Sequence, residues 1–289
     1  MLGAIAGDII GSVHEFRAIA TKTKDFGVLF VDKVQKTQTV KRISTDGFLH
    51  TAGATSHFTD DTVCTIAVAR WLLDRTKSVE AHMRETCNTY PRRGYGGFFS
   101  KWVTDPNSKP YNSWGNGAPM RVSPVGWAAT SIEEAYELAK ESADITHNHP
   151  QAVKGAQAVA GMIYFLKKGT PVNYAVAQIL SDLDADGYYA KIIAKSVDEI
   201  RPGYTFKVSS KNTVPQALVC LMEGKDFEDV IRNAISLGGD ADTIAAIAGS
   251  MAEPLFGIPD NIAKESLQRV DDEMRKTIIE FSKKFMIKE

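Results

Sequence analysis

Two short stretches of the chain combine acidic and hydroxyl side chains at the start of runs of small apolar residues. They are Thr59-Asp-Asp-Thr62 and Gly238-Gly-Asp-Ala-Asp-Thr243. No lysine or arginine occurs in residues 43–69 around the first stretch, or in residues 233–263 around the second. Buried carboxylates need a partner, a proton or a metal ion. These stretches are therefore candidates for a site that binds positive charge.

Helix capping offers a simpler explanation for each stretch taken alone. Aspartate and threonine are common at helix N-termini, where they accept hydrogen bonds from backbone N–H groups and interact with the helix dipole. Tandem aspartates exceed that need, because Asp60 and Asp61 cannot both be the N-cap of one helix. We therefore favour a single acidic site, which Glu15, at the end of an N-terminal helix, would join. The alternative is that two separate caps lie far apart on the surface.

The ligand types indicate which ion such a site would hold. Both stretches offer carboxylate and hydroxyl oxygens and contain neither cysteine nor histidine. Oxygen ligands suit Mg²⁺, Mn²⁺ or Ca²⁺ rather than Zn²⁺. Four or five carboxylates exceed what one Mg²⁺ normally takes, since that ion keeps several waters. A site with two metal ions would balance the charge better.

Helices must position these groups. Residues 1–13 predict a helix on which Gly3, Gly7 and Gly11 lie on one face. That face has no side chains at these positions, which allows close helix packing. Strand-like alternation is almost absent, apart from short candidate strands at residues 28–31 and 39–43. The other predicted helices cover residues 59–73, 79–90, 131–146, 150–168, 171–183, 187–200, 215–222, 227–237, 240–250 and 259–286. We expect an all-α fold, a compact single-domain helical bundle over residues 1–289.

Composition narrows the classes of protein. The chain has 289 residues and a net charge of −1, and its lack of a long basic run does not favour nucleic acid as a partner. No apolar run approaches the ~20 residues that span a membrane, and residues 1–13 lack the basic region of a signal peptide. The three cysteines are far apart, which is typical of a reducing compartment. We expect a cytoplasmic monomer that does not contact membranes.

Five motifs together resemble the signature of the ADP-ribosylglycohydrolase family, which includes the dinitrogenase-reductase-activating glycohydrolase and the ADP-ribosylarginine hydrolases. Each motif alone is weak, whereas five in family order with intact carboxylates are specific. The matching segments are Gly3-Ala-Ile-Ala-Gly-Asp8 with Gly11-Ser-Val-His-Glu15, Thr59-Asp-Asp-Thr62, Gly115-Asn-Gly-Ala-Pro-Met-Arg121, Thr146-His-Asn-His-Pro150 and Gly238-Gly-Asp-Ala-Asp-Thr243.

The resemblance implies an all-α hydrolase with two Mg²⁺ or Mn²⁺ ions in an acidic cleft. One ion would be held by Thr59, Asp60 and Asp61. The other would be held by Glu15, Asp240 and Thr243, with Asp242 bridging both. The residues implied to contact ADP-ribose are Gly115, Asn116, Gly117 and His147. The implied substrate is an ADP-ribosylated protein, often modified on arginine, or an ADP-ribosyl small molecule.

Cleavage of an N-glycosidic bond passes through an oxocarbenium-like transition state, and the leaving nitrogen needs a proton. The candidates for this acid–base role are Glu15, Asp60 and Asp61. Residues 17–57 carry no motif that we can place, so the acceptor stays open. Two alternatives are a non-catalytic relative that only binds ADP-ribose or has a structural role, and a metal-dependent phosphohydrolase. The first would have lost carboxylates, and the second usually mixes histidine with aspartate.

Overall fold

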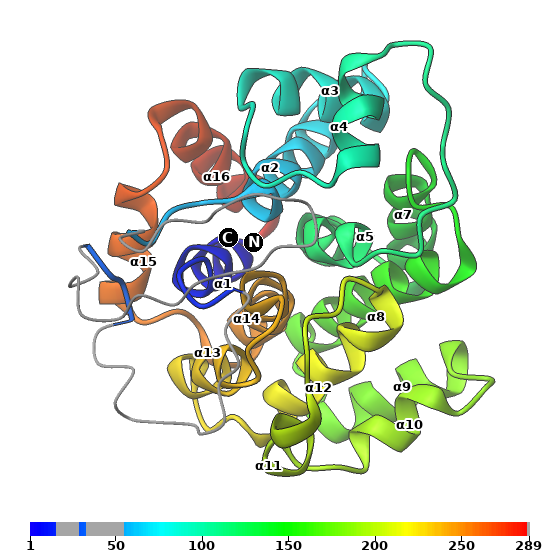
Figure 1. Ribbon diagram of the computed structural model, residues 1–289, viewed down its shortest axis with the longest axis vertical. Coiled ribbons are helices and arrows are strands. Elements are labelled where there is room, and N and C mark those ends of the chain that lie inside the picture. Colours follow the sequence, from blue (N-terminus) through cyan, green and yellow to red (C-terminus); the bar gives the residue numbers. More distant parts are fainter. Residues whose placement is uncertain (16–28, 33–54, 288–289) are drawn as a thin grey trace.

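The centre of the molecule is an antiparallel pair of helices, α1 (Leu2–Gly11) and α14 (Ala241–Phe256), which lie side by side in Figure 1. A Cβ added to Gly7 would lie only 2.0 Å from the Ala245 carbonyl oxygen, and one added to Gly3 would lie 2.3 Å from that of Gly249. The predicted role of the glycine stripe in close helix packing is therefore confirmed.

The structure is a computed structural model that describes residues 1–15, 29–32 and 55–287. The helices that follow α1 are α2 (Asp60–Leu73), α3 (Val79–Thr89), α4 (Gly97–Thr104), α5 (Gly117–Arg121), α6 (Ser123–Ala128), α7 (Ile132–Asp144) and α8 (Pro150–Lys167). The second half of the chain forms α9 (Val172–Leu183), α10 (Tyr188–Ile193), α11 (Val197–Ile200), α12 (Val214–Glu223), α13 (Phe227–Ser236), α14, α15 (Asp260–Gln268) and α16 (Asp272–Phe285). Two short 3₁₀ turns are η2 (Arg201–Gly203) and η3 (Ser210–Asn212).

The described residues contain no β-strand, only an isolated bridge between Gly115 and Ser209. The expected all-α fold is confirmed. Of the candidate strands, residues 29–31 are not in a strand, while residues 28 and 39–43 lie outside the described residues.

The other helices surround the central pair (Figure 1). Helices α8, α12 and α13 pack on α14, whereas α2 packs on α1 and carries α3 and α16 on its outer side. Residues 241–253 of α14 are all buried, so this helix has no solvent-exposed face in its first three turns. Polar groups at the start of α14 are therefore held in the interior rather than on the surface.

Two predicted helices are each divided in the structure. The segment 187–200 forms α10 and α11, because Ser196 caps a new helix by accepting a hydrogen bond from the Glu199 backbone N–H. The segment 259–286 forms α15 and α16, because Asp271 caps α16 through the Met274 backbone N–H at 2.8 Å. In both places a side-chain cap competes with continuation of the helix.

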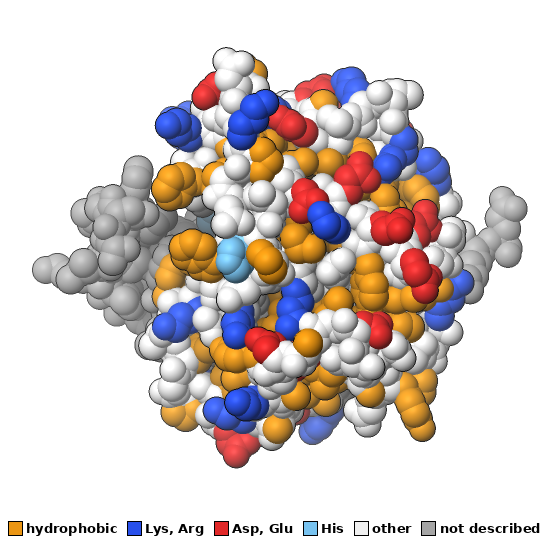
Figure 2. Space-filling view, turned by 90° about the vertical axis from the view of Figure 1, so that its right-hand side faces the viewer, with side chains coloured by type: hydrophobic (Ala, Val, Ile, Leu, Met, Phe, Trp, Pro, Cys, Tyr) orange, Lys and Arg blue, Asp and Glu red, His pale blue; other side chains and the backbone are white. Residues whose placement is uncertain are grey.

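One face of the molecule carries charge of both signs. Figure 2, which looks onto the right-hand side of Figure 1, shows acidic and basic side chains both spread over this face rather than a continuous basic surface. Among the described residues, no helix combines the length and apolar character that crossing a membrane would require.

Candidate metal centre

The two acidic stretches meet where α1 ends and α2 and α14 begin. Oxygen atoms of Asp8, Asp61 and Asp242 lie within 4.8 Å of one another, and so do oxygen atoms of Glu15, Asp240 and Asp242. The Thr243 hydroxyl donates to Asp61 Oδ2 at 3.2 Å, which joins the two stretches directly. The alternative of two distant helix caps is therefore wrong. We call the set formed by these five carboxylates the acidic cluster: Asp8, Glu15, Asp61, Asp240 and Asp242.

The start of α2 presents Asp61 to this cluster because Thr59 does the capping. The Thr59 hydroxyl oxygen accepts a hydrogen bond from the Asp61 backbone N–H at 3.3 Å, and the hydroxyl donates to Asp8 Oδ1 at 2.6 Å. The Asp61 carboxylate is thus released from capping. Its Oδ1 is buried and has no hydrogen-bond partner in the part of the chain that the structure describes. An unpaired buried carboxylate oxygen is costly, so this atom is suited to bind a cation.

The start of α14 is shaped by a double glycine. Gly238 and Gly239 have φ values of +69° and +66°, in the left-handed region that glycine adopts without steric penalty. They turn the chain from α13 into α14 and leave Asp240 at the N-cap position. The Asp240 side chain makes no capping hydrogen bond and instead accepts one from the Asn116 side-chain amide at 2.6 Å.

Asp8 is the member of the cluster that our sequence-based ligand set omitted. It lies in the middle of α1, is fully buried, and accepts hydrogen bonds from the backbone N–H groups of Thr59 (2.9 Å) and Thr62 (3.1 Å) and from both of their hydroxyls. The sequence did contain a signal. An aspartate inside an apolar helix, with no lysine or arginine before Arg17, needs a partner from another segment.

Asp60 lies at the rim and belongs to neither oxygen group. Its backbone N–H donates to the Arg93 carbonyl at 2.8 Å, and its Oδ1 faces Gly94, where an added Cβ would lie 3.1 Å away. Asp60 and Glu15 are partly exposed, whereas the other carboxylates of the site are buried. These two side chains are therefore the carboxylates of the site that solvent can reach.

Burial and mutual repulsion disfavour the ionised form of the carboxylates in this site. Burial raises the pKa of Asp61 and Asp242 well above the usual range, and the neighbouring carboxylates raise it further. Burial and the charges of Asp8 and Asp240 raise the pKa of Asp60 to about 8. No ion pair with a lysine or arginine is found among the described residues for the aspartates of the site, Asp8, Asp60, Asp61, Asp240 and Asp242.

The chemistry of the acidic cluster suits divalent cations. The donors are hard oxygens, and one buried oxygen, Asp61 Oδ1, has no hydrogen-bond partner among the described residues. Such a set suits Mg²⁺ or Mn²⁺. The structure therefore places five carboxylates where they could bind metal.

The loop of Gly115, Asn116 and Gly117 lies beside the acidic cluster, and His147 lies against the loop. A Cβ added to Gly117 would lie 2.7 Å from His147 Nε2, and one added to Gly115 would lie 3.3 Å from the same atom. The four residues expected to contact a ligand thus lie together. The Asn116 amide, however, is already engaged by Asp240 and by the Thr213 hydroxyl (3.2 Å). Its side chain therefore orients a carboxylate rather than pointing freely at a ligand.

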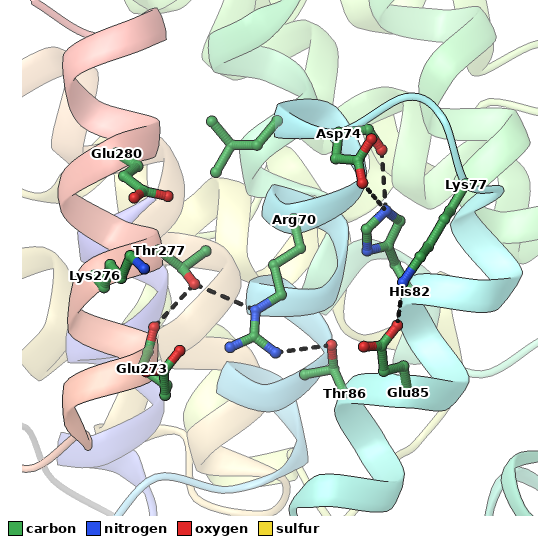
Figure 3. A pocket seen from close by; sticks show the side chains of 11 residues that line it. Arg70, Asp74, Lys77, His82, Glu85, Thr86, Glu273, Lys276, Thr277 and Glu280 are labelled. Atoms are coloured by element: carbon green, nitrogen blue, oxygen red, sulfur yellow. Dashed lines mark hydrogen bonds and ion pairs between the residues drawn. The ribbon is translucent and has the colours of Figure 1, made fainter.

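A hollow of about 370 Å³ lies away from the acidic cluster, between α2, α3 and α16 (Figure 3). Its side chains carry both signs of charge and bond to one another. Lys77 pairs with Glu85 at 2.9 Å, and Arg70 donates to the hydroxyls of Thr277 and Thr86 at 3.3 and 3.4 Å. Because these groups already satisfy one another, the acidic cluster is the better candidate for chemistry.

Comparisons with known proteins agree with the geometry. The family model for ADP-ribosylglycohydrolase matches residues 1–289. ADP-ribosylhydrolase ARH3 of Mus musculus is 25% identical over 315 residues, which cover 89% of this chain and 83% of the relative. ADP-ribosylarginine hydrolase Tri1 of Pseudomonas putida is 26% identical over 200 residues, covering 66% of this chain and 52% of the relative.

A solved structure described as an ADP-ribosylglycohydrolase-related protein complex has the same fold. It superimposes with a TM-score of 0.67 at 21% sequence identity, covering 98% of this chain and 96% of the other. At this level of identity the match supports the fold alone.

Proposed function

Because the chain belongs to the ADP-ribosylglycohydrolase family, we propose that it is a metal-dependent glycosidase that removes ADP-ribose from a modified protein side chain. We propose arginine as the modified side chain. The likeness to a relative named ADP-ribosylarginine hydrolase supports this choice. An ADP-ribosyl small molecule offers the same bond and is the second substrate class to be tested.

The observation that carries this proposal is the convergence on Asp242. This one buried carboxylate belongs to both oxygen groups, with Asp8 and Asp61 on one side and Glu15 and Asp240 on the other. A shared carboxylate between two groups of oxygens is the arrangement expected for two neighbouring cations. We therefore assign two Mg²⁺ ions, or Mn²⁺, to the acidic cluster, with Asp242 as the bridging ligand.

The hydroxyls of Thr59 and Thr243 orient these ligands. Thr59 donates to Asp8 and Thr243 donates to Asp61, so both threonines act on the ligand set whether or not they also coordinate an ion. Bound divalent ions would supply positive charge that orients hydroxyl groups of the ribose and lowers the pKa of a water molecule.

The acid–base role falls to the exposed carboxylates. The leaving nitrogen of an N-glycosidic bond needs a proton, and the proton carrier must come within hydrogen-bond distance of it. Glu15 and Asp60 are partly exposed, whereas Asp61 is 3% exposed and faces the interior of the cluster. We therefore propose Glu15 or Asp60 for proton transfer and Asp61 for holding a cation.

A substrate panel tests the function directly. Purified protein is incubated with arginine-, serine- and nucleic-acid-linked ADP-ribose and with ADP-ribosyl small molecules, and released ADP-ribose is quantified with Mg²⁺, with Mn²⁺ and with EDTA. We expect release from the arginine-linked substrate that requires the metal. A phosphohydrolase would instead release phosphate or AMP. Binding of ADP-ribose without release from any substrate would favour the non-catalytic alternative.

A further inference from the structure

Arg121 is fully buried and acts on the histidine beside the glycine loop through an intermediate threonine. Its Nη2 donates to the Ser142 carbonyl oxygen at 2.6 Å and to the Thr146 Oγ1 at 3.0 Å. Among the described residues no carboxylate pairs with this guanidinium, and its Nε and Nη1 have no hydrogen-bond partner. Arg121 Nη2 is therefore shared between the Ser142 carbonyl oxygen and the Thr146 hydroxyl.

The Thr146 hydroxyl is also 2.7 Å from Nδ1 of His147. A guanidinium can only donate, so Thr146 Oγ1 must accept from Arg121. Thr146 is completely buried, and Nδ1 is the one acceptor that the described residues place near its own hydroxyl hydrogen. If Nδ1 carried the proton, Thr146 would accept twice and its O–H would be left buried without an acceptor. The arrangement is satisfied only if Thr146 donates to an unprotonated Nδ1.

We infer that Arg121 and Thr146 are positioning residues that fix His147 as a neutral imidazole with its proton on Nε2, facing the Gly115–Gly117 loop. Nε2 makes no hydrogen bond with the described residues and is not among their fully buried, unsatisfied atoms. It thus presents an N–H group at the mouth of the site. A donor fixed in this way selects an acceptor oxygen, such as a phosphoryl or ribose oxygen of ADP-ribose, and this choice of ligand rests on the proposed function.

The surroundings favour the neutral ring. Burial, together with the charge of Arg121, holds the pKa of His147 well below its usual range. The loop is shaped to keep Nε2 reachable, because any side chain at position 117 would collide with this atom at 2.7 Å. The Arg121–Thr146 pair thus acts on Nδ1, where it directs the proton to the other nitrogen, and Gly117 leaves space at Nε2.

The tautomer can be tested without any substrate. Long-range ¹H–¹⁵N correlation spectra distinguish the two ring nitrogens, and the His147 signals are assigned by their loss in His147→Gln. We expect the wild-type ring to carry its proton on Nε2 between pH 6 and 8, Thr146→Ser to retain that pattern, and Thr146→Val to populate both tautomers. A wild-type ring protonated on Nδ1 would overturn the inference, and so would an unchanged pattern in Thr146→Val.

Binding then tests what the fixed donor does. With Mg²⁺ present, Thr146→Val should weaken free ADP-ribose binding roughly fivefold, as expected for loss of one oriented hydrogen bond, and Thr146→Ser should restore it. The matched control is Thr277→Val, which removes another buried threonine hydroxyl that accepts from a guanidinium, that of Arg70, in the separate hollow of Figure 3.

Two failures are distinguishable. Equal ADP-ribose affinity in wild type and a folded Thr146→Val would overturn the role assigned to Thr146 while leaving the proposed function intact. If wild type bound no ADP-ribose, the proposed function and the ligand named here would both fail, and the ring spectra would still decide whether Thr146 sets the tautomer. A thermal melt of each variant shows whether it is folded at the temperature of the binding experiment, so that loss of binding is not confused with unfolding.

Discussion

Asn116 donates its side-chain amide to Asp240 Oδ2 at 2.6 Å, which couples the glycine loop to the acidic cluster. The amide also donates to Thr213, so Asn116 links three segments that are far apart in the chain. A residue that the motif suggests as a ligand contact therefore lies behind a proposed metal ligand. Outer residues of this kind tune metal affinity through the orientation of the ligand.

Asn116→Ala should accordingly weaken Mg²⁺ binding, by roughly tenfold, because Asp240 loses the donor that orients it. Isothermal titration with Mg²⁺ measures this. Asn88→Ala, at an exposed residue of α3 whose side-chain amide donates to the Val103 carbonyl, is the control. Unchanged Mg²⁺ affinity together with weaker ADP-ribose binding would mean instead that Asn116 contacts the ligand directly.

Replacing the shared carboxylate should separate stability from function. Asp242→Asn removes a buried carboxyl group whose ionisation is opposed by burial and by its neighbours, so the metal-free variant should be more stable than wild type by about 1 kcal/mol. The rise in melting temperature that Mg²⁺ gives by mass action should disappear, together with ADP-ribose release, while the helical circular dichroism spectrum persists. Asp144→Asn, at a surface aspartate paired with Lys140, should retain both responses. Full Mg²⁺ stabilisation in Asp242→Asn would contradict the bridging role.

The stability of the metal-free protein should fall as pH rises. Asp60 has an ordinary pKa of 3.8 and a folded-state pKa of about 8, so the folded state binds more protons than the unfolded state between these values. Stability must decrease with pH across that window, since its slope follows the difference in bound protons. Urea unfolding in EDTA at pH 5 and pH 8 tests the sign.

Mg²⁺ should reverse this trend, because metal ions and protons compete for the same carboxylates. The increase in unfolding free energy on adding Mg²⁺ should be larger at pH 8 than at pH 5. The same increase at both values would show that the ion binds away from the acidic cluster.

The close contact of α1 and α14 should not tolerate a methyl group. Gly7→Ala would place a Cβ 2.0 Å from the Ala245 carbonyl oxygen, so the two helices must move apart. The cost of such overpacking is about 1–3 kcal/mol, which exceeds the ~1 kcal/mol that alanine gains over glycine in a helix. Gly97→Ala, at the first residue of α4, meets no atom within 4 Å and should be neutral or slightly stabilising. Chemical denaturation of wild type and of each single variant measures the change in unfolding free energy.

Local features of the chain determined much of this protein. The spacing of Gly3, Gly7 and Gly11 predicts a close helix contact, and the tandem aspartates after Thr59 and after Gly239 predict carboxylates at two helix starts, because helical periodicity and capping act over a few residues. The ordered motifs identify the family. The divisions at Ser196 and Asp271 were missed because a cap inside an amphipathic run is a weak local signal.

The tertiary structure decided which atoms meet. Asp8 bonds to Thr59 across 51 residues of sequence, and Asn116 bonds to Asp240 across 124. No local pattern specifies such pairs, because they depend on how whole helices pack against one another. Only that packing left Asp61 Oδ1 unsatisfied, gave Asp242 a place in both oxygen groups, and aligned Arg121, Thr146 and His147 behind the glycine loop.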